Sequence, residues 1–397
     1  MTTNTVDALI LLSSPEAARD PYPVLARLRE EEPVHRTPAG FWLVSRHADA
    51  QALLAGDALR APEQLPAAGG HASLAMRLDT MLLKDGAEHA RLRRLVARDF
   101  TPRRVEGLRA RMAAICDRLL DTVAAELHDG GESDLHRSLS VPFTLQVFSE
   151  LLGVPEGDRA ELAECVQDIV AAFGSGRPDQ LAVADARTEH LTGYFRELAA
   201  ARAAEPQDDL VSALVRARDD DPDRLAEREL LATLWALWIV GFETTAAALD
   251  HGVLALLAHP ELPLDDGFVA EVLRWSGPAL FSSIPRIAVR DLELDGGTVP
   301  AGADVRIAFA AANRDPRAFP DPDRFAPGRA GDAALALGHG IHYCLGAFLA
   351  RAELAVALPR VRARFPALTT AGEPDWNPAV IMHAPATLPV RLGSDGA

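Results

Sequence analysis

The sequence from residue 337 to 346 reads Leu337-Gly338-His339-Gly340-Ile341-His342-Tyr343-Cys344-Leu345-Gly346. Glycines at this density let the backbone turn sharply and approach other groups closely. A helical pattern follows directly, so Cys344 is expected just before a helix N-terminus, where dipole and N–H groups stabilise a thiolate. One interpretation of His339, His342 and Cys344 is a zinc site, although the spacing fits no common zinc module and no fourth ligand is nearby. A loop cysteine without function is the other alternative that these residues leave open.

The stretch resembles the haem-binding loop of the cytochrome P-450 family. The family pattern is an aromatic residue, two residues, glycine, three residues, cysteine, one residue and glycine; Gly340, Cys344 and Gly346 match it. Leu337 stands where the family almost always has phenylalanine, so redox potential and haem affinity can differ from relatives while the ligand is kept. The resemblance implies that Cys344 is the axial ligand of the iron of haem b. It also implies a mainly α fold with small β-sheets (α+β), with a long central helix over the haem.

A second matching segment is Val240-Gly241-Phe242-Glu243-Thr244, at the end of an apolar run from Leu230 that predicts a buried helix. A carboxylate and a hydroxyl that emerge from a buried helix need partners, although an ordinary polar turn is the simpler alternative. The resemblance assigns Glu243 and Thr244 to catalysis, with Thr244 donating a hydrogen bond to dioxygen and Glu243 relaying protons. It also implies that Gly241 opens a groove for oxygen. Val240 replaces the alanine that is usual in the family.

A third segment carries an acid–base pair, Glu271 and Arg274, which lie three residues apart and so meet on one face of a predicted helix. Such pairs are usually solvated and mean little alone. About 70 residues before the cysteine, however, the pair resembles the Glu-x-x-Arg pair of the family. Arg324 is then the expected third member, and the implied role of all three is structural.

The fourth segment, residues 88–94, predicts a helix with two basic faces. At 100° per residue, His89 and Arg93 fall on one face, away from Arg91. The resemblance implies that His89 and Arg93 bind the haem propionates, since charged donors to carboxylates are strong and directional. Arg286 and His342 match the other usual propionate partners. A generic basic helix exposed to water is the alternative.

The opposite face of this helix is a candidate site for a redox partner. Arg91, Arg94 and Arg98 are predicted to form a cationic stripe on an otherwise acidic chain, suited to an acidic ferredoxin. Because no fused flavin or iron–sulfur domain is recognised, the resemblance implies a separate ferredoxin and an NAD(P)H-dependent ferredoxin reductase as partners.

Pocket walls are placed by analogy with the family alone. Residues 60–82 correspond to the loop over the haem, and residues 173–181 to a mobile lid between two helices. The candidate substrate-pocket residues are Met76, Val240, Gly241, Phe281, Ser282 and Met382. A lining of this kind is typical of small-molecule sites and names no substrate.

Composition limits the remaining classes. The chain has 397 residues with 57 acidic and 40 basic side chains, a formal net charge of -17, so nucleic-acid and membrane-surface binding are not expected. The longest apolar run is about a dozen residues, whereas a membrane span needs roughly 20. Cys116, Cys165 and Cys344 are too far apart to suggest a disulfide framework. A cytoplasmic protein is therefore predicted.

The chain is expected to form one domain over residues 1–397, with residues 1–19 as an N-terminal extension. A hairpin is predicted over residues 33–46, nearly continuous helix over 88–258, a second small sheet after Pro285, a helix over 346–364 and a closing hairpin.

The predicted function is that of a haem-thiolate monooxygenase that uses O2 and two electrons to oxidise, by default to hydroxylate, a small natural product. An aromatic or polyketide acid in secondary-metabolite or antibiotic biosynthesis is the expected type of substrate, either free or tethered to a carrier protein. The alternatives are a non-catalytic haem-thiolate sensor, which would need Cys344 but not Glu243 and Thr244, and a zinc or thiol hydrolase. The hydrolase would explain neither Glu271 and Arg274 nor the central helix.

Overall fold

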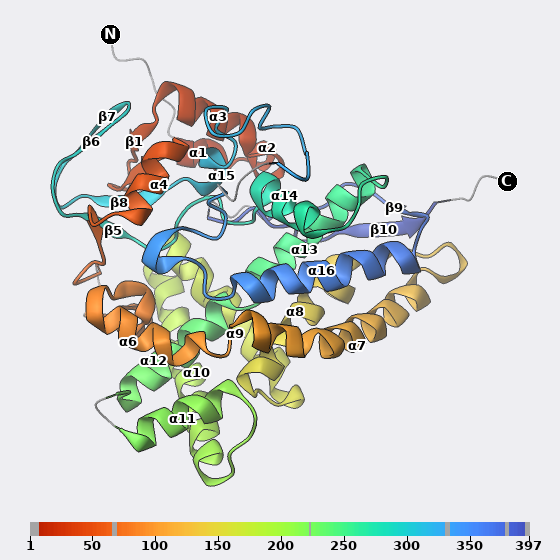
Figure 1. Cartoon of the computed structure of the whole chain (residues 1–397), viewed down its shortest axis with the longest axis horizontal. Helices are drawn as coiled ribbons and strands as arrows, with labels where there is room; N and C mark the ends of the chain where they lie inside the picture. Colours follow the sequence, from red (N-terminus) through yellow and green to blue (C-terminus); the bar gives the residue numbers. More distant parts are fainter. Residues whose placement is uncertain (1–7, 66–69, 222–223, 330–333, 378–380, 394–397) are drawn as a thin grey trace. The chain divides into compact units, whose positions relative to one another are not determined.

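The computed structural model describes residues 8–65, 70–221, 224–329, 334–377 and 381–393 (Figure 1). The chain divides into two compact units. Unit 1 comprises Met1–Arg60, Met112–Pro142 and Thr244–Ala397, and unit 2 comprises Ala61–Arg111 and Phe143–Glu243. The prediction of one domain over residues 1–397 stays a prediction.

Unit 1 contains a five-stranded sheet in the order β1-β2-β8-β5-β3. Its strands are β1 (Val34–Arg36), β2 (Trp42–Val44), β3 (Leu59–Arg60), β5 (Arg286–Ala288) and β8 (Asp304–Ile307). The predicted hairpin is confirmed, with Gly40 at φ +94° in its turn. The prediction of a separate second sheet after Pro285 is wrong in part. Strand β8 pairs in parallel with β2, Trp42 opposite Val305, and joins both regions into one sheet.

Two smaller sheets complete the β structure of unit 1. Strands β6 (Leu292–Leu294) and β7 (Gly297–Val299) form a ribbon around Gly296, whose φ of +119° favours glycine. Strands β9 (Leu368–Thr370) and β10 (Pro389–Leu392) pair as the predicted closing hairpin, but β4 (Ser133–Asp134) adds to β10 on its other edge.

Within the described residues, eight α-helices lie mainly in unit 1, in addition to part of α7. They are α1 (Ala8–Leu12), α2 (Pro15–Arg19), α3 (Tyr22–Glu31), α4 (His47–Ala55), α13 (Glu243–Ala258), α14 (Asp266–Ser276), α15 (Phe309–Ala312) and α16 (Ala347–Arg364). The helix predicted over 346–364 is confirmed as α16. The predicted N-terminal extension contains α1 and α2, and its residues 1–7 lie outside the described part of the chain.

The described residues of unit 2 form helices and the turns and loops that connect them, without a strand. Its helices are α5 (Ala72–Asp79), α6 (Gly86–Ala97), α8 (Val141–Leu152), α9 (Arg159–Ser175), α10 (Pro178–Ala204), α11 (Leu210–Asp220) and α12 (Glu227–Val240), and α7 (Pro102–Glu126) begins here and continues into unit 1. Glycine and proline mark the helix ends where predicted; for example, α9 ends before Gly176 and α10 begins at Pro178.

The predicted buried central helix is confirmed but interrupted. Residues 230–239 of α12 are all buried, and Gly241-Phe242 separates α12 from α13. The stretch Glu227–Ala258 is long and apolar enough to cross a membrane, yet 78% of its most apolar window is buried, as in a core helix.

Candidate functional site

The loop before α16 is shaped by two glycines in the left-handed region. Gly338 has φ +74° and Gly340 has φ +70°. A Cβ atom on Gly340 would lie 2.1 Å from the backbone oxygen of Leu54 in α4, so only glycine fits there. The backbone N–H of Cys344 donates to the oxygen of Leu337 at 2.8 Å, which closes the loop.

This loop places Cys344 three residues before the first residue of α16, as predicted. The thiol is half-buried and forms no disulfide. The positive end of the helix dipole favours negative charge on the sulfur. The zinc interpretation is wrong, because no group of three or more histidine, cysteine or acidic side chains within the described ranges is arranged to hold a metal ion.

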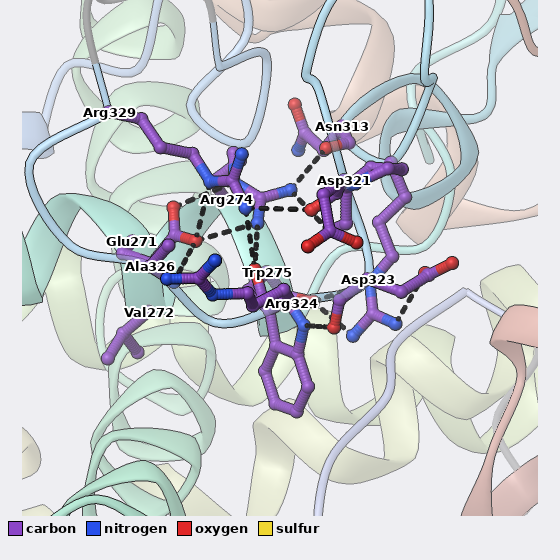
Figure 2. Close-up of polar contacts among 12 residues, drawn as sticks. Glu271, Val272, Arg274, Trp275, Asn313, Asp321, Asp323, Arg324, Ala326 and Arg329 are labelled. Carbon is purple, nitrogen blue, oxygen red and sulfur yellow. Dashed lines mark hydrogen bonds and ion pairs between the residues drawn. The ribbon is translucent and has the colours of Figure 1, made fainter.

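Glu271 and Arg274 of α14 form a buried ion pair, each 3% exposed (Figure 2). Arg274 donates from Nε and Nη2 to the Glu271 carboxylate, both at 2.7 Å, and from Nη1 to the carbonyl oxygens of Asn313 and Pro322. Burial raises the pKa of Glu271, but the hydrogen bonds and charge of Arg274 outweigh it and leave the pKa lowered. A fully paired buried carboxylate of this kind holds its helix to the loop that surrounds it.

The prediction that Arg324 is the third member of this cluster is wrong. Its side chain is exposed, and only its backbone oxygen contacts the cluster, accepting from Arg274 and Arg329. Arg329 is the third member instead, with Nε 3.1 Å from Glu271 (Figure 2). The sequence signal that was missed is the Pro327-Gly328 pair, which turns the chain after residue 326; the N–H of Ala326 also donates to Glu271 at 2.8 Å.

Leu337, the departure from the family pattern, lies beside this cluster. A small hollow of ≈ 80 Å³ is lined by Leu337, Leu273, Phe319 and the Glu271–Arg274 pair. Unit 1 thus has free space next to the position where the family carries a larger aromatic ring.

Three predicted pocket residues of unit 1 lie on neighbouring segments. Ala279 and Met382 form an antiparallel bridge, which brings Met382 next to the segment of Phe281 and Ser282. Phe281 is 5% exposed and packs in a core cluster that includes Leu280, while the Ser282 hydroxyl donates to the oxygen of Ile284 at 2.9 Å. Their roles in a pocket stay predictions.

The acid–alcohol pair lies at the start of α13, where Glu243 is the first residue and Thr244 the second, both half-buried. Packing explains why residue 241 is a glycine, since a Cβ atom there would lie 2.2 Å from the Phe148 ring. Val240 is 46% exposed directly after ten fully buried residues, so apolar surface is presented where α12 ends.

Helix α6 of unit 2 has the two faces that its sequence predicts. His89 is 3% exposed and Arg93 half-buried, whereas Arg94 and Arg98 are exposed. The inclusion of Arg91 in the cationic stripe is wrong, because Arg91 forms a bidentate ion pair with Glu229 of α12.

Arg98 instead borders an open groove of ≈ 1020 Å³ where α6 and α7 meet. Its lining includes six arginines, Arg98, Arg103, Arg104, Arg111, Arg159 and Arg202. Three of them are paired with acids: Arg104 with Asp208, Arg111 with Glu150 and Arg202 with Asp209. The groove was not predicted, because its lining comes from three separate segments, residues 98–111, 150–159 and 202–209.

The residues present fit a haem. Cys344 offers a thiol sulfur at a helix N-terminus, the donor type that holds haem iron in this family. Arg286 and His342 in unit 1 and His89 and Arg93 in unit 2 are donors suited to propionates.

Comparisons with known proteins agree with this chemistry. A family model for cytochrome P-450 matches residues 44–263 and 260–385. The chain is 44% identical to cytochrome P-450 BJ-3 of Bradyrhizobium diazoefficiens, covering 98% of this chain and 97% of that protein. It is 37% identical to the mycinamicin IV hydroxylase/epoxidase of Micromonospora griseorubida, over 91% of this chain and 93% of that one.

A solved structure, P-450 BioI in complex with an acyl carrier protein carrying hexadec-9Z-enoic acid, superposes with a TM-score of 0.88 at 29% identity. It covers 96% of this chain and 99% of that chain. Fold, sequence and the cysteine loop point to one family. The chain belongs to the cytochrome P-450 family and is a monooxygenase whose cofactor is haem.

Proposed function

We propose that this enzyme oxidises a small natural product, by hydroxylation in the default case, in the biosynthesis of a secondary metabolite or antibiotic. The observation that carries the proposal is the pair Glu243 and Thr244 at the break between α12 and α13. A haem protein that only binds a ligand has no need of this pair. The mycinamicin IV hydroxylase/epoxidase is a relative whose name supports this substrate class. The proposed compartment is the cytoplasm.

The haem, when bound, supplies the oxygen activation and one-electron chemistry. The overall change is RH + O2 + 2e⁻ + 2H⁺ → ROH + H2O. Cys344 would hold the iron through its sulfur, and His89, Arg93, Arg286 and His342 would bind the propionates.

Two further residues, Glu243 and Thr244, would deliver protons to the site of the reaction. The Glu243 carboxylate would take protons from solvent and pass them on, and the Thr244 hydroxyl would donate a hydrogen bond at the site where O2 is consumed. Half-burial suits this role, because each side chain keeps contact with solvent while its helix stays fixed.

The test is Thr244→Ala, with Thr245→Ala as a matched control one residue along the same helix. Thr245 is buried at 7% exposure, so its substitution changes packing but not the proposed proton path. Thr244→Ala should divert electrons from NAD(P)H into peroxide while the haem spectrum persists, and Thr245→Ala should stay coupled. Intact coupling in Thr244→Ala would show that the relay is misassigned.

A carrier-tethered substrate is the second candidate, and the acyl carrier protein bound by P-450 BioI favours it. The experiment is an optical titration of the ferric enzyme with aromatic and polyketide acids, first free and then loaded on a carrier protein. A spin-state shift with the loaded acid alone would make the carrier a required partner. A shift with the free acid would assign the enzyme to a free small molecule.

The electrons would come from a ferredoxin and its NAD(P)H-dependent reductase. Arg94 in α6 and Arg98 directly after it support this proposal, because they are exposed cations of a strongly acidic chain. Arg103, which lines the adjoining groove and is also exposed, extends the same basic surface.

A further inference from the structure

We propose that Asp185 is a positioning residue that fixes helix α5 in place and so controls the size of the ligands that reach the haem. This proposal rests on the proposed function and on the sequence-based prediction that Met76 of α5 lines the substrate pocket. Asp185 itself lies on α10 and is assigned no contact with substrate. It acts through His71 and Ser73 at the start of α5, all three within unit 2.

The Asp185 carboxylate caps the N-terminus of α5. One oxygen accepts hydrogen bonds from the backbone N–H of Ser73 at 2.9 Å and from its hydroxyl at 2.6 Å. The other oxygen lies 2.7 Å from Nδ1 of His71. The side chain of His71, the residue before the helix, makes no cap of its own. A carboxylate from another helix therefore supplies the cap that α5 lacks.

Two further contacts hold the same helix along its length. The Arg77 guanidinium lies 4.7 Å from the centre of the Phe173 ring of α9. Asp79, the last residue of α5, forms an ion pair with Arg228 of α12. The N-terminal end of α5 is thus attached to α10, and its C-terminal half is attached to α9 and α12.

Helix α5 needs these attachments because it is only eight residues long. A helix of this length is marginal by itself, so packing and capping determine whether it forms and where it lies. Of its residues only Ser73 and Leu74 are buried. Asp185 makes three of the contacts that fix α5, and charged acceptors make the stronger hydrogen bonds.

The consequence concerns Met76, the predicted pocket residue, which lies between the capped end and Asp79. If the cap is lost, α5 shifts or unfolds more often, and the wall that Met76 contributes moves with it. Small ligands that need little space should be insensitive to this change, whereas bulky ligands should enter faster.

The experiment compares Asp185→Asn with the wild-type haem enzyme, using imidazole and ketoconazole as probes. Both azoles bind haem iron and are followed optically, so no substrate needs to be known. Asp168→Asn is the matched control, because Asp168 pairs with Arg187 of α10 at 2.7 Å but belongs to α9 and not to the α5 cap. Ser73→Ala, which removes one of the three hydrogen bonds, should give a smaller effect in the same direction.

In Asp185→Asn we expect faster hydrogen exchange of residues 72–79. The association rate constant of ketoconazole should rise about tenfold, the factor that corresponds to losing one hydrogen bond to a charged group. The rate constant of imidazole should stay within about twofold, and Asp168→Asn should change neither.

Three results would overturn the proposal: unchanged exchange at α5, unchanged ketoconazole entry despite faster exchange, or equal changes for both azoles. Failure of the proposed function would look different. The wild-type enzyme would then bind both azoles normally and yet oxidise none of the candidate natural products.

Discussion

Two arginines of the segment that surrounds the Glu271 carboxylate differ in what their side chains contact. Arg329 donates to Glu271, while the Arg324 side chain is exposed. We predict that Arg329→Ala lowers the free energy of unfolding by about 2 to 4 kcal/mol, because it leaves a buried charge less well paired. Arg324→Ala should change it by less than about 0.5 kcal/mol. Urea unfolding of both variants measures this difference, and a larger loss in Arg324→Ala would restore the sequence-based assignment.

A buried histidine pair should make the fold sensitive to mild acid. Burial lowers the pKa of His251 to about 4 and that of His383 to about 3, and their ring centres lie 4.9 Å apart. Histidine in the unfolded chain titrates near pH 6.5. Below that pH the unfolded chain takes up protons that the folded chain does not, and this uptake favours unfolding. The free energy of unfolding is therefore highest above about pH 6.5 with respect to these two histidines, and it decreases as the pH falls towards about 4.

The resulting prediction is a loss of about 2 kcal/mol per histidine between pH 6.5 and 5. Urea unfolding at each pH should show it, and His251→Gln should remove about half of the pH dependence. His128, whose side chain is 76% exposed, provides the control His128→Gln, which should leave the pH dependence as it is. An unchanged slope in His251→Gln would contradict the assignment.

Among the elements, helices could be predicted better than sheet connections. The ends of α9 and α10 carry local signals, glycine after one and proline at the start of the other. The pairing of β2 with β8 carries none, because the two strands lie about 260 residues apart and no local sequence pattern specifies which distant strands pair. The same limit applies to the Asp185 cap of α5, whose partners are more than 100 residues apart.

The break between α12 and α13 gives an element-scale prediction. In Gly241→Ala the new Cβ would lie 2.2 Å from Phe148 and 2.6 Å from the backbone oxygen of Leu237, so the helix end must shift. Overpacking of this kind costs about 1 to 3 kcal/mol, and we expect lower coupling of NAD(P)H to product because Glu243 and Thr244 follow directly. Thermal unfolding and peroxide release measure both effects.

Gly193→Ala is the matched control. Gly193 lies within α10, and its Cβ would meet nothing within 4 Å, so alanine should stabilise the helix by about 0.5 to 1 kcal/mol and leave coupling unchanged. A Gly241→Ala enzyme as stable and as coupled as Gly193→Ala would show that the break tolerates a side chain.

At the scale of the whole molecule, the local structure of the candidate site was predictable where its residues lie in one short segment. The loop around Cys344 was predicted from a segment of ten residues, and the pairing of Glu271 with Arg274 from a segment of four. Arg91 was misassigned because a helical wheel shows which face a residue occupies but not what packs on that face, here Glu229. Electrostatic partners therefore have to be read from the folded chain, in which a net charge of -17 coexists with a local basic surface.

The difference between the negative net charge and the local basic surface should govern how fast the enzyme is reduced. The acidic ferredoxin proposed as the partner would be repelled by the net charge of the chain and attracted by the exposed cations Arg94 and Arg98. Arg94→Glu and Arg98→Glu should each slow reduction about tenfold at low ionic strength, and the difference should shrink as salt screens it. Arg290→Glu is the control, since it makes the same change of net charge at an exposed site in unit 1. If Arg290→Glu slowed stopped-flow reduction equally, net charge rather than the α6 surface would govern the encounter.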